Sequence, residues 1–465
     1  MEHRPWLPLI PFSVIAVILI LFTWQQDVYE WYAFEGEVLL SGRNPYLPLN
    51  EFVIEKYGQT GRYGYPPLAL PFFASAAWLV TLTDLPFHLF LGIESLIVLV
   101  LGAWGLLRFV GRPQLVYLWL FNPFILVVAL GWKFLPDLLM VTFFLLAIVH
   151  ARHPRLSGIF LGLAALSKQI VWIFIPLFLW GLYVMFLARH TQQSARSKVL
   201  VCAGVTIATF TAGILPFGYP YSPEAISSLY HGLLDPAEGL GNFSFYTPFV
   251  SSGLFPGIAA TVMSLLLIGG WMLYAGWIYR RLPMPKKDGG LGKESLLRFL
   301  VWSSIPIPIL SMRLGEPHFW LLHVGILALV LSRVSETERP AVGLLYLIIS
   351  GVTYLFFTAQ MGFRHLAFHL SPWPTYAYFT VLGMNWWQWL WVIGSVSLAA
   401  VVWAYLRAFR YERLPLWPRT SEAAKAASSG SSRGVLRTHG RVLLLSVLFA
   451  AVLSGSEVIV WLVAL

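Results

Sequence analysis

The sequence predicts an all-α protein, a polytopic bundle of transmembrane helices, and three observations support this fold class. Of the 465 residues, 58% are hydrophobic and only 11% are charged, whereas a soluble domain carries about 25% charged residues. Apolar runs recur from Trp6 to Leu465, and each is long enough to cross a hydrocarbon core about 30 Å thick. Many of the 21 tryptophans stand at the ends of these runs, where the headgroup zone favours indole rings.

The apolar runs predict about thirteen spans, with short interfacial helices in the first outer loop. One stretch, 156–187, allows a different division. The segment 65–83 is apolar, but Pro66, Pro67 and Pro71 favour a broken or interfacial helix over a crossing. The predicted spans are 6–24, 87–107, 115–131, 136–151, 156–167, 169–187, 199–217, 251–279, 296–312, 318–332, 341–358, 386–406 and 442–463.

The distribution of Lys and Arg predicts the orientation of the spans. Met1–Trp24 lacks a small-residue cleavage site, so a retained first helix with a cytoplasmic N-terminus is expected. All but seven of the 31 basic residues then face the cytoplasm, as the positive-inside rule requires. Loops 25–86 and 218–250 lie outside, and 419–441 is a flexible cytoplasmic linker. The net charge of +10 is spread over short loops, which gives no indication of nucleic-acid binding.

The densest group of carboxylates follows the first predicted span. Asp27, Glu30, Glu35 and Glu37 occur within eleven residues of a chain that has only 21 acidic residues. On a helix, Asp27 and Glu30 would share one face because they are three residues apart. A general base or a metal ligand at the bilayer surface would use such carboxylates, and a solvated amphipathic loop is the alternative.

Basic residues recur in the predicted outer loops. Lys133 and Asp137 stand together at the predicted outer surface, where an ion pair contributes little to stability. Lys168 and Gln169 lie between two apolar runs. A lysine there needs water, an anion or a carboxylate, and its compact charge suits a phosphate. A snorkelling lysine is the alternative.

A further polar group is expected at the outer end of one predicted hairpin. It contains Arg313 and His318, and His318 suits phosphate binding or proton transfer at a membrane surface. Arg364 is another outer cation. The single cysteine, Cys202, lies in an apolar run and is expected to be a buried, inert thiol. Gly158 and Gly162 form a GxxxG pattern, which predicts close helix packing.

The order of these motifs carries a family resemblance. An Asp after the first span is followed by LLxGxNPY (39–46), YxYPPL (63–68), NP…GxxxxxD (122–137) and GLAxxxKQ (162–169). This order resembles the GT-C superfamily of membrane glycosyltransferases. The nearest likeness is to the polyprenyl-phosphate-mannose-dependent group, glycosyltransferase family eighty-seven. The catalytic subunit of the glycosylphosphatidylinositol mannosyltransferase has a similar layout. The resemblance covers roughly residues 20–185.

The resemblance implies an inverting glycosyltransferase. A carboxylate in the first outer loop deprotonates an acceptor hydroxyl, which attacks a sugar held on a polyprenyl or dolichyl phosphate. By its place after the first span, Asp27 is the implied base. Asp27 precedes Tyr32 by five residues and Gly42 by fifteen, one more than the family's usual spacing, so Glu30 and Glu35 stay as alternatives.

The resemblance also implies roles for other residues and partners. Mannose is the family's common donor sugar, and the acceptor is a lipid or a glycan. No cofactor is expected; a divalent metal is permitted but not required. Besides membrane lipids and these substrates no partner is implied, and a monomer is expected. The implied donor-phosphate ligands are Lys168, His318, Lys133, Arg313 and Arg364, and the implied substrate-binding residues are Tyr63, Tyr65, Gln169 and Asp137.

The implied organisation has two modules. Residues 1–217 form a catalytic transmembrane module that includes the outer loop 25–86, and residues 218–465 form a variable transmembrane module. The expected location is the plasma membrane of a prokaryote with the active site on the outer face, and the endoplasmic reticulum is the alternative. A secondary transporter or a flippase for lipids or lipid-linked sugars is the alternative function; transporters place ionisable groups near the bilayer midplane.

Overall fold

The computed structural model describes residues 9–23, 26–46, 66–110, 113–168, 170–187 and 190–217, with shorter stretches between 270 and 354 and at 380–385. Within these ranges, the side chains of residues 26–31, 109–110, 113–115, 173 and 317–320 are not described. The chain divides into two compact units. The first comprises Met1–Gly111 with Leu126–Asp235, and the second comprises Arg112–Ile125 with Pro236–Leu465.

The prediction of a helical protein is confirmed for the described part of the chain. Its only strands are the antiparallel pair β1 (Thr380–Val381) and β2 (Met384–Asn385). Two described helical segments are long and apolar enough to cross a membrane, Phe87–Arg108 and Gln192–Phe217, and further described apolar helices have 10–17 residues. The predicted number of spans also depends on residues outside the described ranges.

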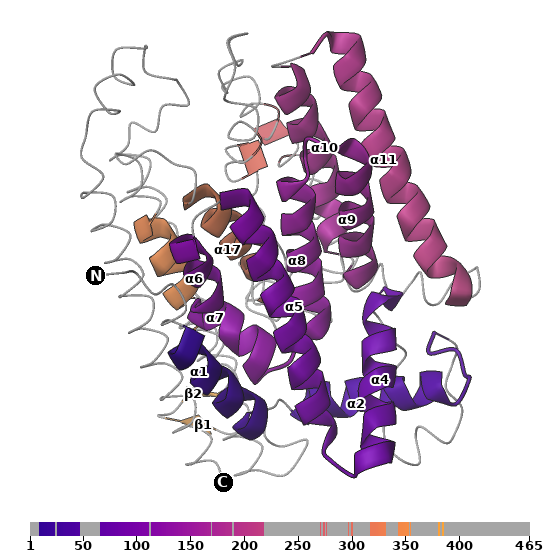
Figure 1. Cartoon of the computed structure of the whole chain (residues 1–465), viewed down its shortest axis with the longest axis vertical. Helices are drawn as coiled ribbons and strands as arrows, with labels where there is room; N and C mark the ends of the chain where they lie inside the picture. The colour runs from indigo at the N-terminus through magenta and orange to yellow at the C-terminus, as the bar shows by residue number, and fades with distance from the viewer. Residues whose placement is uncertain are drawn as a thin grey trace. The chain divides into compact units, whose positions relative to one another are not determined.

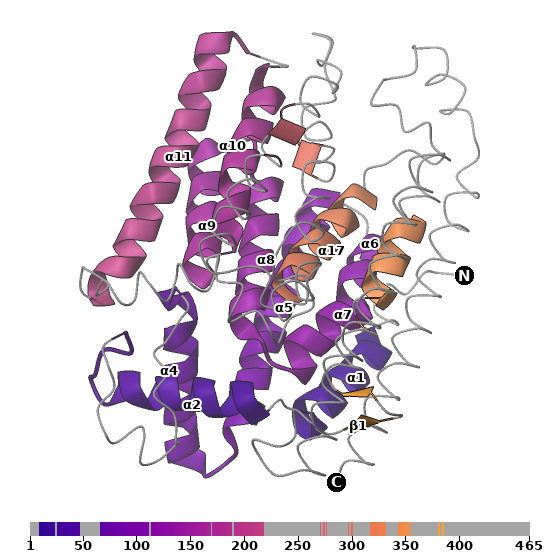
Figure 2. The same cartoon turned by 180° about the vertical axis from the view of Figure 1, so that it is seen from behind.

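The first unit is a bundle of helices with one helix lying crosswise (Figure 1). The long helices α5, α8, α9, α10 and α11 run along the unit, whereas α2 crosses it near one end, as the reverse view also shows (Figure 2). Its elements are α1 (Leu9–Phe22), α2 (Gln26–Leu40), η1 (Pro67–Ala69), α4 (Leu70–Thr83), α5 (Phe87–Val110), the π-helix η2 (Val127–Gly131), α8 (Leu135–Val149), α9 (Pro154–Ser167), α10 (Val171–Leu187), α11 (Gln192–Ile214) and η3 (Leu215–Phe217).

Helix α8 forms the centre of this unit. Almost every residue from Leu135 to Val149 is buried, and α8 packs against both α5 and α9. Helix α9 in turn packs closely on α11. A Cβ atom added at Gly158 would lie 2.6 Å from the Cys202 carbonyl oxygen, and one added at Gly162 would lie 2.6 Å from the Thr209 Cβ. The close packing expected of the two glycines is therefore confirmed, and Cys202 is buried as predicted.

The apolar segment 65–83 differs in part from its prediction. Its helix α4 is unbroken, because the prolines precede it or lie in its first turn, where a missing N–H costs nothing. The helix has 14 residues and is therefore about 21 Å long. It ends at Asp84, whose left-handed backbone (φ 56°) places its N–H against the Val80 carbonyl.

The segment 115–131, predicted as a span, is not a single helix in the structure. The chain forms α6 (Pro113–Leu120), turns at Asn122, and continues as α7 (Pro123–Leu126) and then the π-helix η2. Proline at 123 has no N–H to continue the hydrogen-bonding of α6. The second unit also contains α17 (Pro317–Leu331) and the helix Gly343–Val352.

Candidate functional site

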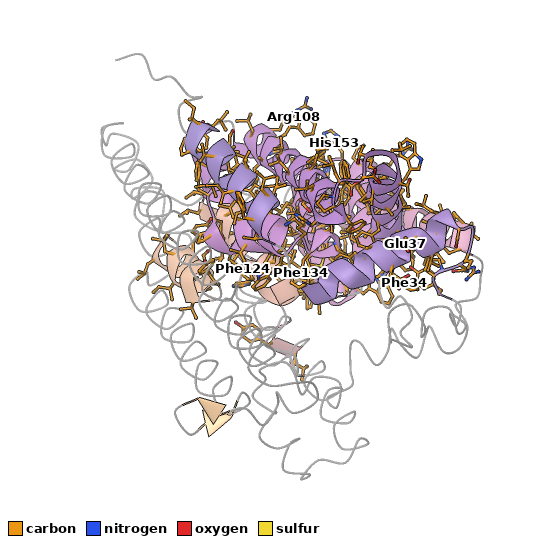
Figure 3. The ribbon with its side chains drawn as sticks, turned by 90° about the horizontal axis from the view of Figure 1, so that it is seen from below. Phe34, Glu37, Arg108, Phe124, Phe134 and His153 are labelled. Carbon is orange, nitrogen blue, oxygen red and sulfur yellow. The ribbon has the colours of Figure 1, made fainter. Side chains whose placement is uncertain are left out.

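Helix α2 crosses α4 at a point of very close contact. The Tyr32 ring stacks on the Phe73 ring with 4.2 Å between centroids. One turn later, a Cβ added at Gly36 would lie 2.3 Å from the Phe73 carbonyl oxygen. Only glycine allows this approach, so α2 is held firmly across α4. Figure 3 views this end of the unit from below, with Phe34 and Glu37 along α2.

The C-terminus of α2 is closed by the first half of the LLxGxNPY motif. Gly42 has φ 73°, and the N–H groups of Gly42 and Arg43 donate to the Leu39 and Val38 carbonyls. This is the usual role of a glycine just after a helix. The Asn44 side chain then donates to the Phe217 carbonyl and accepts from the Tyr46 N–H. In this chain the motif therefore ties α2 to the end of α11.

Glu35 lies in the interior, although it belongs to the expected carboxylate group. Its side chain is 1% exposed, and neither carboxyl oxygen has a hydrogen-bond partner among the residues that the structure describes. Burial raises the pKa of the Glu35 carboxyl from 4.5 to about 8, because a low-dielectric surrounding disfavours the charged form. Glu35 is therefore mostly protonated at neutral pH.

Asp27 and Glu30 lie on α2 with Glu35. Asp27 is in the first helical turn, four residues after Thr23, the last described residue of the α1 segment. Glu30 follows one turn later. A carboxylate in the first turn of a helix interacts favourably with the helix dipole. The helical spacing that puts Asp27 and Glu30 on one face is present in α2.

Lys168 and Asp137 form a buried ion pair. The Lys168 Nζ donates to the Asp137 Oδ2 at 2.8 Å, and their side chains are 4% and 0% exposed. Asp137 comes from the first turn of α8, and Lys168 follows the last turn of α9. The ion pair therefore joins the two ends of the α8–α9 hairpin. Such a pair is held by its geometry, because burying either charge alone is costly.

Lys133 lies in the interior and not at the outer surface, where its sequence position had placed it. It is 2% exposed, and its Nζ donates to the carbonyl oxygens of Thr23 and Gly131. Proximity in the sequence was misleading because α8 begins between the two residues. The helix directs Asp137 toward α9, whereas the backbone of Lys133 turns in the left-handed region.

These groups gather at one end of the first unit. Thr23 follows α1 and leads to α2, and Lys133 contacts it from the end of η2. Asp137 and Lys168 lie at the same end of the α8–α9 hairpin, and η1 contacts both helices of that hairpin. The structure thus brings Asp137 together with Lys168, and Lys133 together with the segment that enters α2.

Several predicted residues fall outside this description. The side chains of Asp27, Glu30 and His318 are not described, although their backbones lie in α2 and α17. Among the side chains that are described, no three of His, Cys, Asp or Glu gather as ligands for a metal ion. The loop 218–250 and the linker 419–441 also lie outside the described residues, as do the predicted site residues Tyr63, Tyr65, Gln169, Arg313 and Arg364.

The NP motif has a structural role within the second unit. Asn122 is fully buried, and its amide donates to Tyr346 Oη at 2.8 Å and Ser350 Oγ at 2.7 Å. Its oxygen accepts from the Ile125 N–H, which caps α7. Tyr346 Oη donates in turn to the Leu118 carbonyl. An Asn before Pro at a helix start signals the cap, but the partners more than 200 residues away had no local signal.

Comparison of the chain with family models, with curated proteins and with solved structures yields no match.

Proposed function

We propose that this chain is a membrane-embedded inverting glycosyltransferase. It moves a sugar, with mannose as the first candidate, from a polyprenyl- or dolichyl-phosphate donor to a lipid or glycan acceptor. The active site lies on the outer face, at the end of the first unit that carries α2. The proposal combines the motif order of the sequence with the arrangement of polar groups at this end.

One observation carries the proposal. A short crosswise helix, α2, begins directly after α1 and holds Asp27 in its first turn. The Asp137–Lys168 pair and Lys133 lie at the same end of the unit. A carboxylate and cations are the two kinds of group that the reaction needs, one for the attacking hydroxyl and one for the departing phosphate.

The exposed surface of the first unit supports membrane insertion. Large apolar side chains are exposed along α5 and α11, including Ile97 at 62%, Ile207 at 65% and Leu200 at 70%. Many large apolar side chains exposed on these helices would be unfavourable in water and are suited to lipid. We therefore propose thirteen spans of GT-C type, with the N-terminus in the cytoplasm of a prokaryote.

The proposed reaction is a single displacement. The Asp27 carboxylate accepts the proton of the acceptor hydroxyl, and the hydroxyl oxygen bonds to the anomeric carbon from the face opposite the phosphate. The bond between that carbon and the phosphate oxygen breaks, and the electron pair leaves with the lipid phosphate. Lys168 is the proposed cation for the developing phosphate charge, with His318, Arg313 and Arg364 as further candidates. The Lys168 side chain is 4% exposed and paired with Asp137, so donor binding must open this ion pair.

Among the three candidate bases, Glu35 fits the reaction least well. A base must reach the acceptor hydroxyl within about 3 Å, but the Glu35 side chain is almost completely closed to solvent. Its raised pKa also keeps most of it protonated at neutral pH. Asp27 is therefore the proposed base, and Glu30 is the alternative.

Transfer by the purified chain in proteoliposomes tests the proposal. The donor is a polyprenyl-phosphate sugar with a radiolabelled sugar, and the product is a labelled glycoside in a membrane-lipid extract. We expect Asp27→Asn to lower kcat by at least about 100-fold, as removal of a general base does. Glu37→Gln, an exposed carboxyl on the same helix, is the matched control and should keep near-normal activity.

Two outcomes would contradict the proposal, one for the choice of Asp27 as the base and one for the glycosyltransferase function. Full activity of Asp27→Asn with an inactive Glu30→Gln would move the base to Glu30. Movement of the labelled lipid across the bilayer without any new glycosidic bond would instead support the transporter or flippase alternative.

A further inference from the structure

Lys133 occupies an unusual place in the fold. It is one of two described residues other than glycine with a positive φ, at 59°, and it follows directly on the π-helix η2 and Trp132. Its side chain is nevertheless 2% exposed. A left-handed conformation of a residue with a Cβ is unfavourable, and π-helical turns are uncommon. Both features persist only where the surrounding contacts stabilise them.

The contacts around Lys133 join the C-terminal ends of α1 and η2. The Lys133 Nζ donates to the Thr23 carbonyl after α1 and, at 3.4 Å, to the Gly131 carbonyl at the end of η2. The Thr23 hydroxyl donates to the Leu19 carbonyl at 2.6 Å and lies 3.4 Å from the Gly131 oxygen. The ammonium therefore serves as a shared C-terminal cap. A cation at a helix C-terminus is stabilised by the carbonyl dipoles.

Helix α5 leaves room for this lysine at a glycine. A Cβ added at Gly92 would lie 3.1 Å from the Lys133 Cε and 2.9 Å from the Ile20 Cγ2. Even one methyl group would therefore press on both α1 and the lysine stem. The absence of a side chain at 92 allows Lys133 to pass between α1 and α5 and reach Thr23.

We propose that Lys133 is a positioning residue that fixes the path of the chain from α1 into α2 and thereby places Asp27. The inference rests on the proposed function and refines it. Lys133 had been expected to bind the donor phosphate, but its ammonium points at backbone carbonyls in the interior. The contact to Thr23 holds the end of the α1 segment four residues before Asp27, while the Gly36 contact fixes α2 farther along.

A labelling experiment tests the positioning independently of transfer activity. Cys202 is the only cysteine and is buried, so the chain provides a low background for thiol labelling. Val28→Cys places a reporter next to Asp27. We expect Lys133→Met to change the rate of reaction with a membrane-impermeant maleimide by about tenfold, the effect of losing one strong hydrogen bond.

Two further variants separate the effect of losing the ammonium from the effect of moving the lysine stem. Lys133→Gly removes the ammonium and relieves the backbone conformation, so labelling should change as in Lys133→Met. Gly92→Ala keeps the ammonium but displaces the lysine stem, and a smaller change in the same direction is expected. It also provides a milder test where the lysine variants fail to fold. Lys198→Met, at the opposite end of the unit, is the matched control and should leave labelling unchanged.

Kinetics distinguish positioning from phosphate binding. A positioning role predicts that Lys133→Met lowers kcat with the donor KM nearly unchanged, whereas a phosphate ligand would raise the donor KM. Folded Lys133→Met with unchanged labelling and a raised donor KM would overturn the inference. If the parent chain transfers no sugar, the proposed function fails, but the labelling result still decides whether Lys133 positions the start of α2.

Discussion

The two ends of the first unit differ in buried charge: among the described residues only the end with α2 buries charged side chains, although Glu37 and Arg43 are exposed there. At the end with α2, the side chains of Glu35, Lys133, Asp137 and Lys168 are almost completely buried. At the other end, basic side chains are exposed at the C-terminus of α5, at the α8–α9 turn and at the start of α11. They are Arg108, Arg152, His153, Arg155, His190 and Arg196, of which Arg108 and His153 are labelled in Figure 3.

The distribution of acidic residues adds to the difference between the two ends. No Asp or Glu occurs between Asp137 and Glu224, so α9, α10 and α11 offer the exposed cations no acidic partner. Arg108 instead lies over the Trp104 ring, 4.3 Å from its centroid. Exposed cations can be solvated or can meet lipid headgroups, whereas buried charges require a partner at a fixed place. Substitutions should therefore have large effects at one end and small effects at the other.

Breaking the Asp137–Lys168 pair should have the largest effect on stability. We expect Lys168→Met to lower the free energy of unfolding by about 3 to 5 kcal/mol, because it leaves the Asp137 carboxylate buried without its cation. The double variant Asp137→Leu with Lys168→Met should recover much of the loss. Thermal unfolding in detergent measures both. A single variant as stable as the parent would show that the pair is not buried in the membrane-extracted protein.

Glu35→Gln should stabilise the protein, with an effect that depends on pH. The folded-state pKa of about 8 exceeds the ordinary 4.5, so the folded state binds the proton more tightly than the unfolded state. The stability of the parent therefore falls as pH rises from about 4.5 to about 8 and then levels off.

The glutamine variant lacks this titration. Its advantage in the free energy of unfolding should be near zero at pH 4.5 and reach about 5 kcal/mol at pH 9. Melting temperatures of both chains over this pH range provide the measurement. An advantage that is the same at every pH would rule out titration of Glu35 as the cause.

Substitutions at the exposed basic end should have the smallest effects. We expect Arg152→Gln and Arg155→Gln each to change the free energy of unfolding by less than about 0.5 kcal/mol in neutral detergent. Their exposed guanidinium groups make no buried contact that the substitution removes. Thermal unfolding alongside Lys168→Met provides the comparison, and a loss as large as that of Lys168→Met would remove the distinction between the two ends.

The sequence predicted much of the fold because hydrophobic periodicity is local. Helices were expected at 6–24, 87–107, 136–151, 156–167, 169–187 and 199–217, and the structure has a helix in each of these ranges. The break at Asn122 and the π-helix after it were not expected. An apolar run conceals a break when the residues on both sides of it are buried, and Pro123 was the one local signal.

The sequence was less informative about the candidate site. It identified Lys133, Asp137 and Lys168 as unusual, since each is a charge beside apolar sequence. It placed Lys133 and Asp137 together at the outer surface because they are close in the chain, whereas the structure buries both and pairs Asp137 with Lys168, 31 residues away. The direction of a side chain depends on where α8 and α9 begin and end. Such pairings depend on three-dimensional packing, which a linear pattern does not contain.

The short length of α8 and α9 has a consequence for the surrounding bilayer. These helices have 15 and 14 residues, or roughly 21 to 23 Å, against about 30 Å of hydrocarbon. The neighbouring α5 has 24 residues and exceeds that thickness. In a membrane this mismatch would thin the lipid beside the short helices or leave their ends below the headgroups. If the proposed function holds, a lipid-linked sugar donor would cross less hydrocarbon thickness to reach Lys168 beside these helices.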